Sequence, residues 1–246
     1  MSDPFVQRLA NSGNGLADGD CAALAHLTRN ARSFDAGDIL AREGEPVARM
    51  LVMLNGWALR YQITDDGQRQ IIALILPGDA CHLHAMALAV ADHDIVTATS
   101  CRVAEVAPYE LARLIEERPA VLHALQWSCL QNESILRAGL TNIGRRRADR
   151  RIAHLLCEIH ARLQAVGLVE DGRFAWPLTQ NEVADATGMT NVHVNRSYKE
   201  LHVAKLFTLK NRCMHVPDVE RLAAFGGFRS DYLRLVPHAT LAASDP

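Results

Sequence analysis

The stretch that decides the fold is Thr179–Leu201, with the sequence TQNEVADATGMTNVHVNRSYKEL. It predicts two short helices joined by a tight turn. Gly188 lies at the turn, because glycine adopts a sharply turning backbone without a Cβ penalty. Thr190 follows as a natural N-cap for the second helix. Together these signals predict a helix-turn-helix motif.

The second predicted helix has an apolar side and a polar side. Val194 and Leu201 face inward. Val192, Arg196 and Lys199 recur on the other side at spacings of four and three. Such a polar face, braced by a partner helix, can enter the major groove of DNA. An ordinary helical hairpin with a solvated face is the alternative, and this stretch alone leaves both open.

Length and composition predict a globular protein. The chain has 246 residues, of which 49% are hydrophobic and 22% are charged, and this length predicts two domains. No apolar run approaches the length that spans a bilayer, and the N-terminal sequence has no signal-peptide pattern. We therefore expect a cytoplasmic protein without a membrane partner.

Charge is distributed unevenly along the chain, although the net charge is only −2. Residues 141–212 hold 12 Lys and Arg against 7 Asp and Glu, whereas residues 1–140 hold 11 against 17. An acidic N-terminal part followed by a basic C-terminal part is typical of a regulator whose C-terminal part binds the phosphates of nucleic acid.

Residues 32–108 consist of short apolar runs separated by turn signals. Asp65-Asp66-Gly67 lies between two alternating segments and predicts a hairpin turn. The spacing of the runs predicts a sheet domain of roughly 80 residues, rolled or closed into a barrel. Its corner glycines are Gly37, Gly44, Gly56 and Gly78.

A long helix is predicted after Pro119, with a seam of residues at alternating spacings of three and four. The seam is apolar at most positions, with Asn132 in its middle. It can pair two protomers, with Asn132 fixing their register, or it can pack on the sheet domain of its own chain. Its members are Leu122, Leu125, Cys129, Asn132, Leu136, Gly139 and Ile143.

The next predicted helix begins with arginines between residues 145 and 151. Arginine is unfavourable at a helix N-terminus, so these side chains should meet anionic groups. Acidic groups of the sheet domain are the favoured partners, and DNA phosphates are the alternative. Residues 205–216 predict a hairpin, or wing, with Lys210-Asn211-Arg212 at its tip. Residues 218–233 predict a short helix and a tyrosine-containing end that packs back.

The sequence provides little support for catalysis or a metal centre. The six cysteines are scattered without a CxxC pair, which predicts reduced thiols in the core and no metal site. No acid–base pair with motif-like spacing and no nucleophile elbow is present. An enzyme is therefore not expected.

The order of β-roll, long helix and winged helix-turn-helix resembles the Crp/Fnr family of bacterial transcription regulators. The resemblance runs from about Phe34 to Val216 and is carried by GDILAREGEP, the hairpin ending in LPGD, CRVAEV and LTQNEVADATGMTNVHVNR. PLTQ followed by VHVNR looks like one large proteobacterial subgroup. The resemblance implies an α+β fold: a β-roll like a cyclic-nucleotide-binding domain (1–118), a dimerisation helix (119–144) and a C-terminal winged helix-turn-helix domain (145–246).

The resemblance also implies a function. Family members are homodimers that bind palindromic double-stranded DNA, one recognition helix per half-site, with RNA polymerase as the expected partner. Arg196 matches an arginine that reads guanine through O6 and N7. Asn191 and Val192 match first-turn positions that face bases, and Val192 stands where many members have a glutamate, so the DNA site should differ. Expected phosphate contacts are Thr179, Gln180, Thr190, His193, Lys199, Lys210 and Arg212.

The sheet domain departs from the cyclic-nucleotide-binding members of the family. Those members cradle the phosphate with Gly-Glu followed by Arg-Ser or Arg-Thr, whereas His82-Leu83 stands here in place of Gly-Glu. No Lys or Arg occurs from Gln70 to Cys101, and a buried phosphodiester needs a fixed cation or a nest of amides. We therefore expect no ordinary cyclic-nucleotide binding.

Cys81, His82 and His84 form a weakly indicated effector pocket. Haem-containing members use a histidine and a nearby thiolate in this part of the roll, so a haem or redox sensor using His84 and Cys81 is one alternative. A core histidine is the more usual role, and no cofactor is expected; Cys21 alone does not supply an iron–sulfur site. A scaffold that no longer binds DNA is a further alternative. The leading hypothesis is a dimeric DNA-binding regulator with an unidentified effector.

Overall fold

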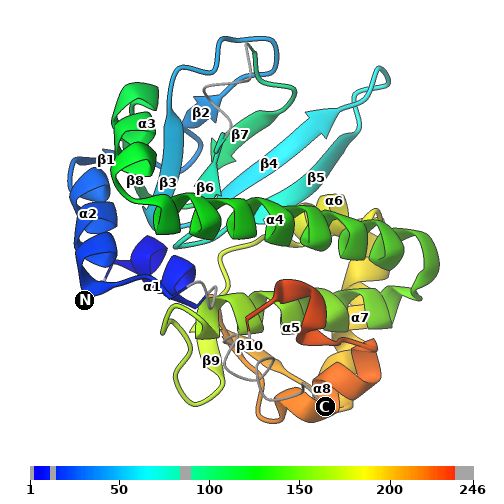
Figure 1. The fold of residues 1–246 in the computed structure, drawn as a ribbon. Coiled ribbons are helices and arrows are strands. Elements are labelled where there is room, and N and C mark those ends of the chain that lie inside the picture. Colours follow the sequence, from blue (N-terminus) through cyan, green and yellow to red (C-terminus); the bar gives the residue numbers. More distant parts are fainter. Residues whose placement is uncertain (1–2, 12–14, 84–89, 236–246) are drawn as a thin grey trace. The chain divides into compact units, whose positions relative to one another are not determined.

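The computed structural model describes residues 3–11, 15–83 and 90–235. They form two compact units, which we name unit 1 (within residues 1–60 and 74–133) and unit 2 (within residues 61–73 and 134–233). The long helix α4 (Pro119–Arg145, green in Figure 1) contributes residues to both. The domain boundaries predicted at residues 118 and 144 stay predictions.

Two four-stranded sheets form the β-roll that the sequence predicted. One has the strand order β1-β8-β3-β6, and the other has the order β2-β7-β4-β5. The predicted hairpin joins β4 to β5, where Thr64 N donates to Gln68 O at 2.9 Å across the turn. The strands are β1 (Ala31–Phe34), β2 (Ile39–Ala41), β3 (Met50–Asn55), β4 (Ala58–Ile63), β5 (Arg69–Ile75), β6 (Ala80–Cys81), β7 (Asp94–Thr97) and β8 (Cys101–Val106).

Gly56 shows why a predicted corner requires glycine. Its φ is 83°, and a Cβ there would lie 2.4 Å from the carbonyl oxygen of Ser100. The turn between β3 and β4 therefore approaches the backbone before β8 so closely that no side chain fits.

Unit 1 has two hydrophobic clusters. In the first, α1 (Pro4–Ala10), α2 (Asp18–Thr28) and α3 (Pro108–Glu117) pack with the start of α4 on the β1-β8-β3-β6 sheet (Figure 1). The second cluster lies between the two sheets and contains Met53, Ile95 and other buried apolar residues. Burial of these side chains is the main favourable contribution to the folding of the roll.

A buried ion pair ties α1 to the turn after β5. Arg8, which is 5% exposed, pairs with Asp79 and also donates to Gln131 of α4. Asp79 in turn accepts from Leu76 N at 2.7 Å, which closes the LPGD turn. Removing one partner of such a pair leaves a buried charge and is strongly destabilising, so Arg8 links three separate segments of unit 1.

Unit 2 contains the helix-turn-helix and the wing that the sequence predicted. Helix α5 (Ala148–Gln164) packs against α7, α8 and η1, and a three-stranded sheet has the order β10-β11-β9. The other elements are β9 (Arg173–Ala175), α6 (Gln180–Thr187), α7 (Asn191–Val203), β10 (Thr208–Lys210), β11 (Cys213–His215), α8 (Val219–Gly226) and the 3-10 helix η1 (Ser230–Leu233).

The tyrosine-containing end packs back on α5, as predicted. Tyr232 stacks on His154 with ring centroids 5.9 Å apart, and Phe228 meets the same imidazole edge-on at 5.3 Å. The segment after α8 is thus held by an aromatic cluster in addition to the α5–α8 packing. Within the described residues, no helix has the length and apolar character needed to cross a membrane.

Candidate functional site

The turn of the helix-turn-helix is held by caps at both ends of α6. Thr179 Oγ1 accepts from Glu182 N at 3.2 Å, while Glu182 Oε2 accepts from Thr179 N at 2.7 Å, which forms a reciprocal capping box. Gly188 ends α6 in the left-handed region, at φ 61° and ψ 42°. A Cβ on Gly188 would lie 3.1 Å from Ile143 Cγ2. The backbone between the two helices is therefore fixed by local geometry.

Helix α7 begins at the predicted N-cap, where Thr190 Oγ1 accepts from His193 N at 3.4 Å. Val194 and Leu201 are fully buried, as predicted. The proposed base-reading side chains lie on the exposed face, with Val192 76% exposed. The exposed residues of this face are Asn191, Val192, His193, Arg196 and Lys199.

Arg196 has a neighbour that the sequence analysis missed. Its Nε lies 3.7 Å from Glu200 Oε1 in an i,i+4 pair, and both side chains are more than half exposed, at 65% and 53%. The i,i+4 spacing was the available signal. Exposed pairs of this kind contribute about 1 kcal/mol or less, so Arg196 can leave Glu200 for a stronger acceptor.

Two further contacts join α6 and α7 on their exposed side. Asn191 Nδ2 donates to Asn181 Oδ1, and Asn195 Nδ2 donates to Gln180 Oε1 at 3.4 Å. Neither Asn181 nor Asn195 was singled out in the sequence. These amides hold Asn191 and Gln180 in place at the surface where α7 begins.

The wing is a hairpin, as the sequence predicted, and its turn consists of the two residues between β10 and β11. Asn211 and Arg212 both have positive φ, at 51° and 56°, as in the turns that match the twist of a hairpin. Arg212 O accepts from Trp176 N at 2.8 Å, which anchors the tip. Lys210 and Arg212 are both exposed, so the tip offers cations to an external partner.

The arginines at the start of α5 bind groups that the sequence analysis did not anticipate. Arg151 Nη1 donates to Thr187 O at 2.6 Å, at the C-terminus of α6, and Arg146 Nη2 donates to Gly227 O at 3.3 Å. Arg147 Nε lies 3.9 Å from Asp149. Backbone carbonyls at helix ends carry partial negative charge, and they supply the anionic character that these arginines need.

The predicted seam residues on α4 differ in their surroundings. Leu125 belongs to the core of unit 1, and Asn132 Oδ1 accepts a long hydrogen bond from Arg8 at 3.4 Å. In contrast, Leu136 is 44% exposed and Leu140 is 75% exposed. Leu140 was outside the predicted seam, yet it lies one turn after Leu136. The exposed apolar face of α4 therefore contains Leu136 and Leu140, whereas Leu125 lies on the buried side of the helix.

The predicted effector residues are not equivalent. Cys81 is 3% exposed and packs in the core cluster between the sheets. His82 is half-buried and has a φ of 56°, a left-handed conformation that glycine adopts far more readily than histidine. His84 lies outside the described residues. Of the two described residues, His82 is the one that lines a cavity.

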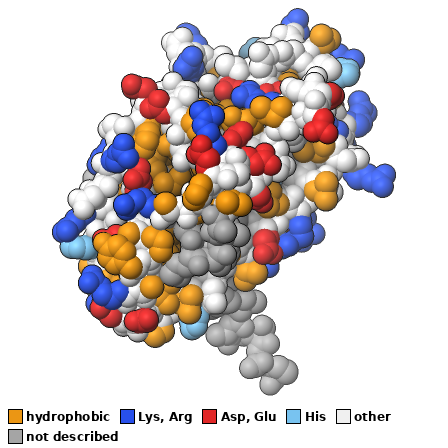
Figure 2. Space-filling view, turned by 90° about the horizontal axis from the view of Figure 1, so that it is seen from above, with side chains coloured by type: hydrophobic (Ala, Val, Ile, Leu, Met, Phe, Trp, Pro, Cys, Tyr) orange, Lys and Arg blue, Asp and Glu red, His pale blue; other side chains and the backbone are white. Residues whose placement is uncertain are grey.

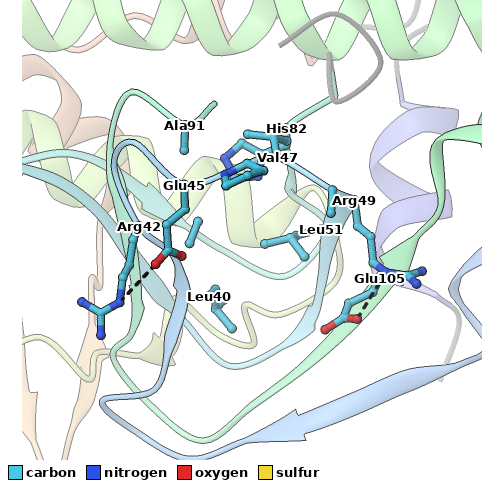
Figure 3. Close-up of a pocket in the computed structure, with 12 residues that line it drawn as sticks. Leu40, Arg42, Glu45, Val47, Arg49, Leu51, His82, Ala91 and Glu105 are labelled. Carbon is cyan, nitrogen blue, oxygen red and sulfur yellow. Dashed lines mark ion pairs between the residues drawn. The ribbon is translucent and has the colours of Figure 1, made fainter. Parts of the chain in front are cut away.

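His82 lines a cavity of about 180 Å³ in unit 1 (Figure 3). Leu40, Val47 and Leu51 give the cavity an apolar wall. Its rim carries two loose ion pairs, Arg42–Glu45 at 4.0 Å and Arg49–Glu105 at 3.9 Å (dashed in Figure 3). The cavity thus combines an apolar interior with polar and charged side chains at its edge.

A second histidine and an arginine accompany His82. The ring centroids of His82 and His93 lie 5.4 Å apart. Burial lowers the pKa of His82 to about 4, and it also lowers the pKa of His93. The charge on Arg60 lowers both pKa values further. Arg60 lies on β4, before the cation-free stretch from Gln70 to Cys101, so no signal in the sequence connected it with His82.

Charged side chains on the face drawn in Figure 2 are mixed in sign. Lys and Arg side chains alternate there with Asp and Glu, and apolar patches lie between them. Mixed surfaces of this kind favour solubility and do not by themselves attract DNA. Among the described residues, no cluster of three or more His, Cys, Asp or Glu side chains could hold a metal ion.

Comparison with known proteins agrees with this geometry. Residues 31–118 match the family described as the cyclic nucleotide-binding domain, and residues 150–225 match the Crp-like helix-turn-helix domain. The chain is 30% identical to the nitrogen fixation regulation protein FixK of Bradyrhizobium diazoefficiens, over 72% of this chain and 73% of FixK. It is 28% identical to the transcriptional activator protein FnrL of Cereibacter sphaeroides, over 87% of each protein.

A solved structure shows the same fold. FixK2 from Bradyrhizobium japonicum superposes with a TM-score of 0.70 at 22% sequence identity, over 80% of this chain and 96% of FixK2. The β-roll, the long helix and the winged helix-turn-helix follow one another in the order that the sequence predicted. The chain therefore belongs to the Crp/Fnr family of transcription regulators.

Proposed function

We propose that this protein binds palindromic double-stranded DNA as a homodimer, with α7 of each protomer in the major groove of one half-site. The observation that carries the proposal is the exposed row of polar side chains on α7, presented by the fixed turn at Gly188. Arg196 reads a guanine in this proposal, because its guanidinium offers two donors to O6 and N7. Asn191 and Val192 face the neighbouring bases.

The remaining exposed polar groups supply phosphate contacts. Hydroxyl, amide and cationic side chains on α6, α7 and the wing can bind phosphate oxygens and set the orientation of the helix on the duplex. All seven expected residues are exposed in unit 2: Thr179, Gln180, Thr190, His193, Lys199, Lys210 and Arg212.

Dimerisation uses α4 in this proposal. Leu136 and Leu140 are exposed apolar side chains on one face of that helix, and exposed apolar faces favour association. Cys129 and Ile143 extend the face, and Leu122 begins it. Leu125 and Asn132 instead support the helix within their own chain. RNA polymerase is the proposed partner of the DNA-bound dimer.

The β-roll senses an effector other than an ordinary cyclic nucleotide. Its cavity of about 180 Å³ compares with the roughly 150 Å³ engineered cavity that holds one benzene ring, so a whole nucleotide exceeds it. Haem at Cys81 and His84 is not part of the proposal, since Cys81 packs in the core between the sheets.

Selection from a random duplex library tests DNA reading and needs no operator sequence as its starting point. The protein is expected to enrich an inverted repeat with a guanine at one fixed position in each half. Arg196→Gln should lose the preference at that guanine, while Arg113→Gln, at an exposed arginine of α3, should enrich the original site. Recovery of unrelated sequences, or of the same site by Arg196→Gln, would contradict the proposal.

A further inference from the structure

Three neighbouring buried nitrogen atoms in unit 1 make no hydrogen bond within the described part of the chain. They are Arg60 Nε, His82 Nε2 and His93 Nε2. They come from β4, from the segment after β6 and from the segment before β7. Strand β4 lies beside β7 in its sheet, and the His82 and His93 rings are 5.4 Å apart, which brings the three side chains together. A buried polar atom without a partner is costly, and native structures contain few of them. A group bound between them would supply the missing hydrogen-bond partners.

The charges around the cluster define that group. Asp92 Oδ1 accepts from His93 Nδ1 at 2.6 Å, but the Asp92 side chain is 87% exposed and lies on the solvent side of the imidazole. Asp94 is the other carboxylate whose charge reaches His93. His82 faces His93, Arg60 and Asp92. The inner side of the cluster thus presents the Arg60 cation and two imidazole nitrogens, and the described residues place no acceptor against these three atoms.

The shape of the neighbouring space defines the rest of the ligand. His82 belongs both to the cluster and to the wall of the cavity of about 180 Å³ (Figure 3). The apolar part of that wall comes from Leu40, Val47 and Leu51. The cavity has room for a branched aliphatic group or one ring. An anionic head beside Arg60 and an apolar body in the cavity would satisfy both features.

We propose that Arg60, His82 and His93 form the effector site of this regulator and that it takes a small carboxylate with an apolar body of up to one ring. Arg60 donates to the carboxylate, and His93 donates through Nε2 once it is protonated, with Asp92 stabilising the imidazolium from the other side. Binding therefore takes up a proton. Calling the ligand an effector rests on the proposed regulatory function, whereas the binding itself does not.

The linkage sets the direction of the pH dependence. Burial holds the pKa of both histidines below their ordinary value in the free protein. A carboxylate beside them favours the charged imidazolium, so the pKa of the histidine is higher in the complex than in the free protein. Protons are therefore bound together with the ligand. For each proton taken up, lowering the pH by one unit raises the affinity for the carboxylate by up to tenfold.

Titration calorimetry on the full, DNA-free chain tests the site. The probes are formate, isobutyrate and benzoate, which differ in the size of the apolar body, together with isobutyramide and benzamide as uncharged controls. We expect isobutyrate or benzoate to bind more tightly than formate and the amides not to bind. Affinity should be higher at about pH 6 than at about pH 8, and buffers of different ionisation enthalpy should report proton uptake.

Variants test the role of the cluster. Arg60→Gln should abolish carboxylate binding, Asp92→Asn should reduce proton uptake, and Arg102→Gln, at an exposed arginine of β8, should leave binding unchanged. If Arg60→Gln does not fold, Arg60→Lys keeps the charge but not Nε, and should weaken binding at least tenfold.

The same titrations define what would overturn the site. Absence of binding for all three carboxylates, equal binding of the amides, or wild-type affinity in both Arg60 variants would overturn it. None of these titrations contains DNA, so the DNA selection can succeed or fail independently of them.

Discussion

Tyr232 Oη donates a hydrogen bond to Glu158 Oε2 at 2.8 Å. Glu158 is 7% exposed, and its other oxygen accepts from Arg162 Nη1 at 3.4 Å. Burial raises the pKa of Glu158, while the Arg162 charge and the Tyr232 hydrogen bond act in the opposite direction. A residue near the end of the described chain therefore satisfies a carboxyl group inside α5.

Replacing Tyr232 by phenylalanine should destabilise unit 2. The ring stays, but Glu158 Oε2 loses its donor in a buried position, which costs about 1–3 kcal/mol. Urea unfolding followed by fluorescence measures the difference. Tyr109→Phe, at a side chain that is 73% exposed, is the control and should unfold like the parent. Equal stability of Tyr232→Phe and the parent would show that water replaces the hydroxyl.

Acid should destabilise the protein partly through His154. This imidazole is 2% exposed, and burial, with the charge of Arg146, lowers its pKa to about 4. The pKa of His154 in the folded protein lies below its value of about 6.5 in the unfolded chain. Its contribution to the free energy of unfolding is therefore fully present above about pH 6.5, where the imidazole is neutral in both states. That stability is lost as the pH falls towards 4, by up to roughly 3 kcal/mol.

The contribution of His154 can be isolated by substitution. His154→Phe keeps a ring against Tyr232 but cannot be protonated, so its free energy of unfolding should fall less between about pH 7 and about pH 4.5 than that of the parent. Urea titrations across this range give the comparison. An unchanged pH dependence in His154→Phe would assign the acid sensitivity to other groups.

Gly188→Ala should destabilise unit 2 more than Gly227→Ala. Both glycines have positive φ, at 61° and 58°, so both substitutions cost about 1–2 kcal/mol of backbone strain. A Cβ on residue 188 would also lie 3.1 Å from Ile143 Cγ2, whereas nothing lies within 4 Å of a Cβ on residue 227. Thermal unfolding of the two variants compares them directly. A smaller loss for Gly188→Ala would mean that Ile143 moves aside without cost.

Arg196→Ala and Lys199→Ala should affect DNA binding in different ways. Loss of a base-reading arginine costs roughly 1–3 kcal/mol and relaxes preference at one guanine in each half-site. Loss of a phosphate contact weakens binding about equally for all sequences and lowers the salt slope by about 1. Fluorescence anisotropy on selected and base-substituted duplexes at several salt concentrations distinguishes them. Equal loss of sequence preference in both variants would refute the separate roles.

Cyclic AMP should give no thermal shift. The cavity in unit 1 has room for about one ring, and His82-Leu83 stands where cyclic-nucleotide-binding relatives have Gly-Glu. Differential scanning fluorimetry at saturating nucleotide measures this. A rise of several degrees would contradict both the size argument and the proposed carboxylate ligand.

Local signals explain which elements could be predicted from the sequence. Gly188, the Thr190 cap and the Asn211-Arg212 turn each depend on residues within a few positions, and the helix-turn-helix and wing follow from them. The contacts of Arg8 with Asp79 and Gln131 join segments far apart in the chain. The spacing of residues within one segment carries no information about a contact with a distant segment, so these contacts could not be predicted.

The candidate sites show the same division. The exposed face of α7 follows from helical periodicity, so the exposure of Arg196 and Lys199 could be predicted. Arg60 joins His82 and His93 only because the roll brings β4 beside two later segments. A search confined to residues 70–101 therefore missed the cation. On α4, periodicity found an apolar seam but not the contact of Asn132 with Arg8, which depends on the position of α1.

The pair between Arg196 and Glu200 bears on how the protein finds its target among random sequences. On an arbitrary duplex, the carboxylate one turn away competes with phosphates for the guanidinium, so the cation attracts the backbone less than a lone arginine would. At the guanine that we propose Arg196 reads, its two donors would meet two acceptors, and this bidentate contact would outcompete the Glu200 carboxylate. Breaking this exposed pair costs the same on any duplex, so Glu200 lowers the affinity for random sequences and for the proposed site alike. The protein is then held less tightly by arbitrary DNA, while the difference in binding free energy between wrong and right sequences stays the same.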